Sequence, residues 1–258
     1  MPAAPTSSTQ TNSAIKARQA CNILGDERPD AEHASAWLMP LDRNTRGQRD
    51  FSNTMAWANS SACATWLHSS LPTPALAHAL NERTKAVLPD DYRVLLRCYD
   101  PRVLPEIQAV LRADQAAGYW ALDGQWAYVD RARTFRVIDL SPVRTSATFE
   151  APLVLTQPQA DQLLAAAEVD TVMPELMRES PDAFMAVPIA DRAAFTKRAL
   201  QVADQFALEA LADRVMFCVL TLELGVGFEN SEQWASLMVK VKQRQLTLLQ
   251  AIEQAIKK

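Results

Sequence analysis

The sequence predicts an α+β protein, with an N-terminal mixed α/β lobe carrying a small sheet at residues 14–146 and an all-helical C-terminal lobe at residues 150–258. Short apolar or alternating runs, bounded by polar turns, recur through the first lobe. Beyond about Pro152 these strand patterns stop, and segments rich in Ala, Leu and Glu follow. Residues 1–13 are rich in Pro, Ser and Thr, so we expect a disordered tail there.

The first lobe is expected to begin with three strands and a helix. Cys21–Leu24 and Ala36–Leu41 are short apolar runs that predict strands, and the second run is ended by Pro40 and the polar stretch DRNTRGQRD. Ala62–Ser70 is a third strand candidate. Thr73 and Pro74 then predict the N-cap and first turn of a helix, since both residue types favour helix starts.

The segment YRVLLRCYDPRVL (92–104) is expected to open as a strand and to end as a helix. Its first eight residues alternate, which places Val94 and Leu96 on one face and Arg93 and Leu95 on the other.

Asp100 lies at the joint of this segment, directly before Pro101 and an apolar helical stripe that runs to Leu111. An Asp-Pro pair in this position predicts a helix cap and first helical residue, and such a cap contributes about 1 kcal/mol. That structural role explains Asp100 without a substrate. The alternative is that Asp100 is a catalytic acid.

A β-hairpin is expected next, because the runs QWAYV and TFRVI flank the four-residue segment DRAR. Trp126 and Tyr128 are expected on one side of this hairpin, with Phe135 and Val137 able to pair with them.

The second lobe is expected to contain five helices. Thr156 and Gln159 fit a capping box, and Gly225 suits the position just after a helix. The helices are expected from Thr156 to about Glu168, from Val172 to Met177, from Asp191 to about Phe206, from Leu208 to Leu224, and from Ser231 through Ile256.

Composition limits the possible partners and compartments. A net charge of −4 gives no electrostatic footprint for nucleic acid. The longest apolar stretch, Val215–Phe228, is interrupted by Glu and Gly and is short of the roughly 20 residues that a bilayer requires. The N-terminus has no signal-peptide pattern. We therefore expect a cytoplasmic protein that binds neither membrane nor nucleic acid.

The cysteines and histidines indicate neither disulfides nor metal. The four cysteines are widely spaced without a CxxC pair, which favours reduced, structural thiols. The three histidines lack the spacing of a metal motif, so no metal is expected. These residues are Cys21, Cys63, Cys98 and Cys218, with His33, His68 and His78.

No motif for catalysis or cofactor binding is found. The sequence lacks a GxSxG elbow, a phosphate-binding GxxxxGK[ST] loop and a GxGxxG fingerprint after a strand. We therefore expect no enzyme activity, no cofactor and no small-molecule substrate. The one enzymatic alternative is a cytosolic hydrolase that uses Asp100 and His68 at strand ends, where sites of α/β sheets often lie.

The run VLLRCYDPRVL resembles a strand of the effector adaptor (chaperone) family of the bacterial type VI secretion system, which reads roughly RVLFRFYDPRVL. This family was long known only as a domain of unknown function. Further similar segments follow in the family's order: SAWLMPL at 35–41, TWLHSS at 65–70, LTQPQADQL at 155–163 and the late helical segment at 211–234.

The resemblance covers about residues 20–245, and its most specific part is the Tyr-Asp-Pro-Arg-Val-Leu core at 99–104. One departure lies at the start. Family members usually begin with a strand such as YALLDGA and a helix, whereas this chain has TNSAIKARQA at 11–20. The first βα unit is therefore expected to be absent or rearranged.

The resemblance implies carriage and not catalysis: an adaptor holds an effector (toxin) protein in the cytosol and loads it onto the VgrG spike protein. Arginines and aromatic residues near the core motif are the candidate partner contacts, since interfaces favour these types. Core packing is the alternative for each aromatic residue. An immunity protein that blocks a toxin is the second functional reading. The candidate contacts are Arg97, Tyr99, Arg102, Trp120, Trp126 and Tyr128.

Overall fold

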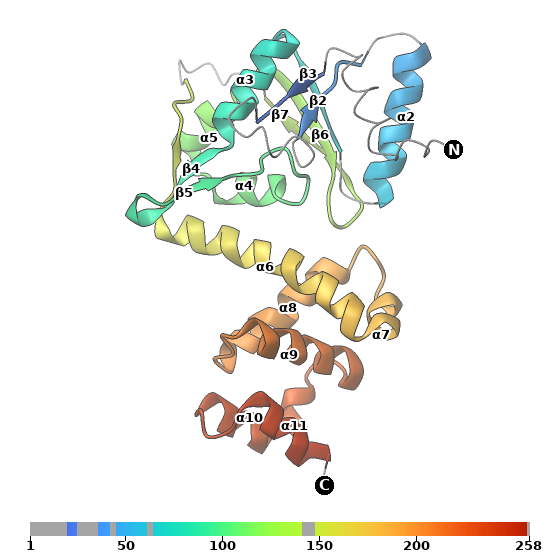
Figure 1. The fold of residues 1–258 in the computed structure, drawn as a ribbon, viewed down its shortest axis with the longest axis vertical. Coiled ribbons are helices and arrows are strands. Elements are labelled where there is room, and N and C mark those ends of the chain that lie inside the picture. The colour runs from blue at the N-terminus through green and yellow to red at the C-terminus, as the bar shows by residue number, and fades with distance from the viewer. Residues whose placement is uncertain (1–19, 25–35, 42–44, 61–63, 141–147, 257–258) are drawn as a thin grey trace, which may run out of the picture. The chain divides into compact units, whose positions relative to one another are not determined.

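The structure is a computed structural model that describes residues 20–24, 36–41, 45–60, 64–140 and 148–256. Contacts divide the chain into two compact units, Met1–Leu163 and Leu164–Lys258, and the division falls within helix α6 (Gln157–Glu179). The first unit combines small sheets with helices and the second is helical, which confirms the predicted α+β class (Figure 1). The predicted tail and the departure at 11–20 lie almost wholly outside the described residues.

The described part of the first unit contains three small sheets (Figure 1). Strand β1 (Cys21–Asn22) pairs antiparallel with β2 (Trp37–Leu38). The second sheet is antiparallel with the order β3–β6–β7, formed by Thr65–Ser69, Gly124–Val129 and Phe135–Asp139. In the third sheet, the central strand is β4 (Lys85–Val87). It pairs antiparallel with β5 (Arg93–Leu95) on one side and parallel with β8 (Leu153–Val154) on the other.

Three helices share the main core of this unit with the sheets: α3 (Thr73–Arg83), α4 (Leu104–Val110) and α5 (Ala113–Tyr119). Leucines of α3 and α4 and the Tyr119 ring of α5 pack with Trp126 of β6, and all of them are fully buried. Burying large apolar side chains in this way is the main stabilising contribution.

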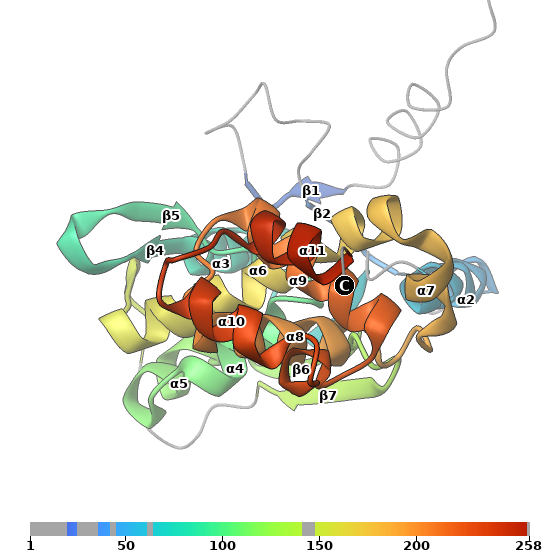
Figure 2. The same ribbon diagram turned by 90° about the horizontal axis from the view of Figure 1, so that it is seen from below.

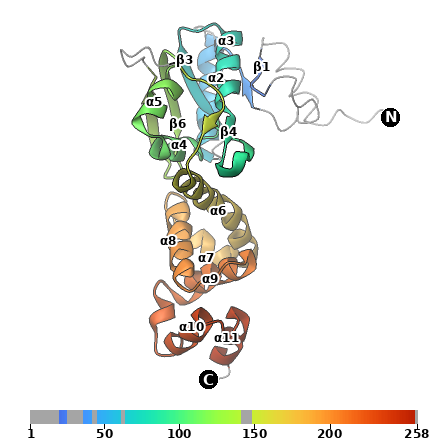
Figure 3. The ribbon, with the colours of Figure 1, turned by 90° about the vertical axis from the view of Figure 1, so that its left-hand side faces the viewer.

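Helix α2 (Thr45–Ser60) was not predicted, since the sequence indicated only a polar stretch after Leu41. A polar helix of this kind gains its stability from tertiary contacts more than from its own residues. Trp66 of β3 donates from Nε1 to Thr54 Oγ1 at 2.9 Å, and its ring meets Phe51 edge-on with centroids 5.5 Å apart. Figure 3 shows α2 beside β3.

The predicted hairpin is confirmed, but the expected side-chain pairing within it is wrong. Trp126 is opposite Ile138, whereas Phe135 and Val137 are opposite Val129 and Ala127. Side chains alternate between faces along a strand, so this register puts Phe135 and Val137 on the other face, where about half of each is exposed.

In the second unit, α9 (Leu211–Leu224) contributes to two buried clusters. One cluster joins it to α6, α7 (Pro181–Ala186) and α8 (Arg192–Gln205). The other joins it to α10 (Ala235–Lys242) and α11 (Leu248–Ile256). Figure 3 shows α10 beside α11, in agreement with the contacts between them.

Some helix boundaries of this unit agree with those predicted from the sequence, and others do not. The Thr156 N–H donates to Gln159 Oε1 at 2.9 Å, which confirms half of the capping box, and α9 ends at Gly225 with φ +96°. Helix α6 continues through Pro174 to Glu179, so the predicted break after Glu168 is wrong. The final predicted helix is divided into α10 and α11, with Arg244 at φ +57° between them.

No helix in the described part of the chain is both long and apolar enough to cross a bilayer.

Candidate interaction site

The Asp100 carboxylate lies in a tight polar cluster between β5 and α4. Its Oδ1 accepts hydrogen bonds from the backbone N–H and the Nε of Arg102, both at 2.9 Å. Its Oδ2 accepts from Arg102 Nη2 at 2.7 Å, and Arg97 Nη1 lies 3.5 Å from that oxygen. The carboxylate is 8% exposed, whereas both arginines are partly exposed. Asp100 is therefore held by its own neighbours.

The helix that Asp100 and Pro101 were predicted to cap begins later than expected. Helix α4 starts at Leu104, and its N-cap residue, Val103, makes no side-chain cap bond. Residues 101–103 form a turn instead, because the Asp100 carboxylate takes the Arg102 N–H while the Asp100 carbonyl accepts from Val103 and Leu104, each at 2.9 Å. The carboxylate therefore stabilises the turn before the helix and not the first helical turn.

Burial raises the pKa of Asp100, but the hydrogen bonds and charge of Arg102, together with the charge of Arg97, outweigh burial. The pKa consequently lies below its ordinary value of 3.8. A carboxyl group with a lowered pKa is ionised near neutral pH and is a poor proton donor there.

Asp100→Asn is expected to lower the free energy of unfolding of the first unit by about 1–2 kcal/mol at pH 7, because the amide loses the charge-assisted bonds. The folded pKa is depressed, so the stabilisation is fully present above pH 3.8 and is lost as the pH falls through the folded pKa. Urea unfolding of both proteins near pH 7 and near pH 2 tests this. The difference should shrink at the lower pH, and an equal loss at both would contradict the assignment.

Two of the predicted partner contacts, Trp126 and Tyr128, are 0% and 3% exposed. Both belong to β6, the central strand of its sheet, and both belong to the main core. A side chain without accessible surface cannot contact a partner unless the unit opens, so we remove both residues from the partner surface. The expectation was wrong because strand alternation shows which residues share a face but not which face is covered.

The other predicted contacts keep some accessible surface. Tyr99 and Trp120 are half-buried against the core, and the Trp120 ring packs edge-on against Tyr119 and Trp126 with centroids 4.9 and 6.3 Å away. Arg97 and Arg102 both contact the Asp100 carboxylate. The structure thus brings the two arginines together at the Asp100 turn.

A buried arginine that the sequence did not single out holds two helix ends together. Arg83 is 5% exposed in the last turn of α3. Its guanidinium donates to carbonyls of Tyr119 at 2.5 Å, Gly118 at 3.2 Å and Ala121 at 3.4 Å, and to Ala79 of its own helix at 2.8 Å. Burial lowers the pKa of Arg83. Carbonyls at helix C-termini carry partial negative charge, so they stabilise this cation in place of a carboxylate.

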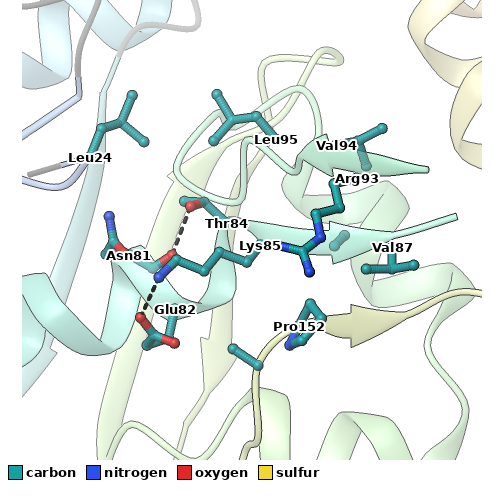
Figure 4. A pocket seen from close by; sticks show the side chains of 12 residues that line it. Leu24, Asn81, Glu82, Thr84, Lys85, Val87, Arg93, Val94, Leu95 and Pro152 are labelled. Carbon is teal, nitrogen blue, oxygen red and sulfur yellow. Dashed lines mark hydrogen bonds and ion pairs between the residues drawn. The ribbon is translucent and has the colours of Figure 1, made fainter. Parts of the chain in front are cut away.

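A hollow of about 560 Å³ lies over one face of the β5–β4–β8 sheet (Figure 4). Lys85 and Leu95 are paired across β4 and β5, as are Val87 and Arg93, so these four side chains share one face. Ala86 of β4 is buried on the opposite face, toward the core. The remaining lining residues are Leu24, Asn81, Glu82, Thr84, Val94, Ala151 and Pro152.

The two cations of the hollow, Lys85 and Arg93, differ in whether they contact a carboxylate (Figure 4). Lys85 Nζ donates to Glu82 Oε1 at 2.7 Å. The exposed Arg93 side chain points into the space between Lys85 and Pro152. In the described part of the chain, the Arg93 guanidinium has no hydrogen bond and no ion pair.

The strand β4 and the hollow were missed from the sequence, although one signal was present. The Pro89-Asp90-Asp91 segment lies between two short apolar strands, and Asp90 and Asp91 have φ +63° and +58°. Asp tolerates this left-handed region better than most residues. The segment is therefore the turn of a hairpin, β4–β5.

Among the residues that the structure describes, Cys98 and two histidines bear on the question of a nucleophile. Cys98 is fully buried, and burial raises its pKa to about 12, so the thiol stays protonated at neutral pH. His68 and His78 are exposed on β3 and α3, and His33 lies outside the described residues. No group of three or more potential metal ligands occurs among the residues that the structure describes.

Comparison with known proteins identifies the region that contains this site. Residues 3–118 match a family model described as "Domain of unknown function (DUF4123)". A DUF4123 domain spans residues 3–118. No curated protein and no solved structure matched the chain.

The DUF4123 domain includes the Asp100 turn, the β4–β5 hairpin and most of the hollow. It ends within α5, so strands β6, β7 and β8 and the helical unit follow it. Pro152, which lines one side of the hollow, therefore comes from outside the DUF4123 domain.

Proposed function

We propose that this chain is a non-enzymatic adaptor that binds a type VI secretion effector in the cytosol and loads it onto the VgrG spike. The observation that carries the proposal is the DUF4123 match over residues 3–118. The Tyr-Asp-Pro-Arg-Val-Leu motif at 99–104, by which the chain resembles the adaptor family, lies inside that match.

The environment of Asp100 supports carriage over hydrolysis. Both carboxylate oxygens accept bonds from Arg102, and the pKa lies below its ordinary value. A general acid or base is most effective with a pKa near the working pH, and it must reach the substrate. Asp100 meets neither condition, and its arginine neighbours have the chemistry of a protein contact.

The test is recovery of partners from native cytosol with the full chain as tagged bait. We expect a toxin-like protein and a spike protein to co-purify with it. Arg97→Ala should reduce this recovery, because Arg97 is partly exposed and, among the described residues, its one ion pair is the long contact with Asp100. The matched control is Arg198→Ala, an exposed arginine on α8 of the other unit.

Recovery of neither protein would contradict the adaptor proposal. Recovery of a toxin alone, with neutralisation of that toxin by the purified chain, would favour the immunity protein instead. A hydrolase would require turnover that Asp100→Asn abolishes while the protein stays folded.

A further inference from the structure

The floor of the hollow over β4 and β5 includes two apolar side chains, Val87 and Leu95. Leu95 is 41% exposed, and Val154 of β8, which lies outside the lining of the hollow, is 63% exposed. Val154 is paired with Val87, so it continues the same face of the sheet. The hollow has a volume of about 560 Å³, which is within the range of pockets that take small ligands or several side chains.

Strand β5 lies at the edge of its sheet (Figure 2), and no other strand among the described residues pairs with its outer side. The Leu96 N–H donates to Thr84, and the Tyr92 carbonyl accepts from Leu88, so the even-numbered residues of this strand face β4. In an antiparallel ladder the alternate residues point away from the partner strand. Arg93 and Leu95 therefore direct their N–H and C=O groups outward, where another strand can pair with them.

The charge of the hollow is net positive. Its lining carries two cations, Lys85 and Arg93, and one carboxylate, Glu82, which is already bonded to Lys85. Arg93 is the cation that points into the open space without a partner in the described chain. A guanidinium binds a carboxylate through two parallel hydrogen bonds, so the complementary ligand is acidic.

We propose that this hollow receives an extended acidic segment of a partner protein, which adds as a strand to the open edge of β5 and places a carboxylate on Arg93. Backbone pairing with β5 supplies affinity, and alternate side chains reach the apolar floor and the cations. The identity of the partner, a toxin or a spike protein, rests on the proposed function. The acidic and extended character of the segment is inferred from the hollow itself and does not depend on the proposed function.

A synthetic peptide tests the chemistry with the full chain. The probe is a fluorescein-labelled heptapeptide of alternating valine and glutamate, with blocked ends, and its fluorescence anisotropy is followed. We expect saturable binding that weakens with added salt. The same peptide with lysine in place of glutamate should not bind. Absence of saturable binding by the acidic peptide up to about 1 mM, the weakest affinity that strand addition with an ion pair would give, would overturn the proposal.

Two variants separate the ion pair from the strand addition. Arg93→Glu reverses the charge, and Leu95→Pro removes an outward N–H that the β4 ladder does not use. Each should raise the dissociation constant by about tenfold or more. Arg198→Glu makes the same charge change on α8 and should leave binding unaltered. Circular dichroism checks that each variant is folded. Equal binding by Arg93→Glu and the wild type would overturn the proposal.

The competing occupant is this chain's own segment 25–35, which directly follows Leu24 and carries Asp26, Glu27, Asp30 and Glu32. A variant with these four carboxylates changed to amides distinguishes the two. If the four-amide variant binds the acidic peptide and the wild type does not, segment 25–35 occupies the hollow, and the partner proposal is wrong.

The two proposals fail in different ways. If the wild type recovers toxin and spike from cytosol and Arg93→Glu recovers both equally, the adaptor function stands and the β5 site is wrong. If no partner is recovered but the acidic peptide binds through Arg93, the site stands and the adaptor function is wrong.

Discussion

Replacing Arg83 with methionine is expected to lower the free energy of unfolding of the first unit by about 3–5 kcal/mol. The guanidinium is 5% exposed and bonds four carbonyls, three of them at the C-terminal end of α5. Methionine fills much of the same volume but donates no hydrogen bond, so all four carbonyls lose this donor in a buried site, although the Gly118 carbonyl keeps the N–H of Ala121. A buried acceptor left without a donor costs about 1–3 kcal/mol.

Urea unfolding followed by far-ultraviolet circular dichroism measures this loss, and hydrogen exchange assigns the transition to the first unit. Arg112→Met is the matched control, because Arg112 is half-exposed and its one ion pair in the described part of the chain is with exposed Asp114; its cost should stay within about 1 kcal/mol. Arg83→Lys should recover only part of the loss, since an ammonium lacks the planar fork that reaches separate carbonyls. Equal costs for Arg83→Met and Arg112→Met would contradict the structural assignment.

Trp126→Ala is expected to cost about 3–5 kcal/mol in the same unit. Trp126 is fully buried at the centre of the β3–β6–β7 sheet and meets the Trp120 ring edge-on. Truncation to alanine removes the largest side chain of this core and leaves a cavity that its neighbours fill only in part. The same unfolding measurement applies.

Trp126→Phe is expected to cost much less, about 1 kcal/mol. The buried indole Nε1 has no hydrogen-bond partner among the described residues. Phenylalanine removes that unsatisfied donor, and this gain offsets part of the lost packing. The folded Trp126→Phe protein should recover partners as the wild type does, because Trp126 has no accessible surface. A loss of binding by the stable variant would return Trp126 to the partner surface.

Local patterns in the sequence predicted those features that neighbouring residues specify. The β6–β7 hairpin follows from two alternating runs around a four-residue loop. The end of α9 follows from Gly225, since glycine adopts φ +96° without steric cost. The alternation of the segment 92–99 correctly separated buried Leu96 and Cys98 from exposed Arg93, Leu95 and Arg97.

Features that depend on distant contacts were not predictable in this way. Helix α2 is mostly polar in sequence, and it is tied to the sheet through Trp66. Strand β4 has three residues, too few for a periodic signal, and it forms because β5 and β8 lie on both sides of it. The Asp-Pro motif predicted a helix cap at Asp100. Instead, the Asp100 carboxylate accepts hydrogen bonds from the side chain and backbone of Arg102, and α4 begins at Leu104.

The order of residues alone determined the two-part α+β character and the turn-forming Asp-Pro pair at 100–101, because each depends on residues close together in the chain. Only the folded chain decided that Arg83 is a buried cation, that Trp126 belongs to the core, and that Arg93 points into an open hollow. These outcomes require carbonyls and strands 35 or more positions away. The burial of a side chain and its charge partners depend on which segments distant in the sequence come into contact, and a local sequence pattern does not specify those contacts.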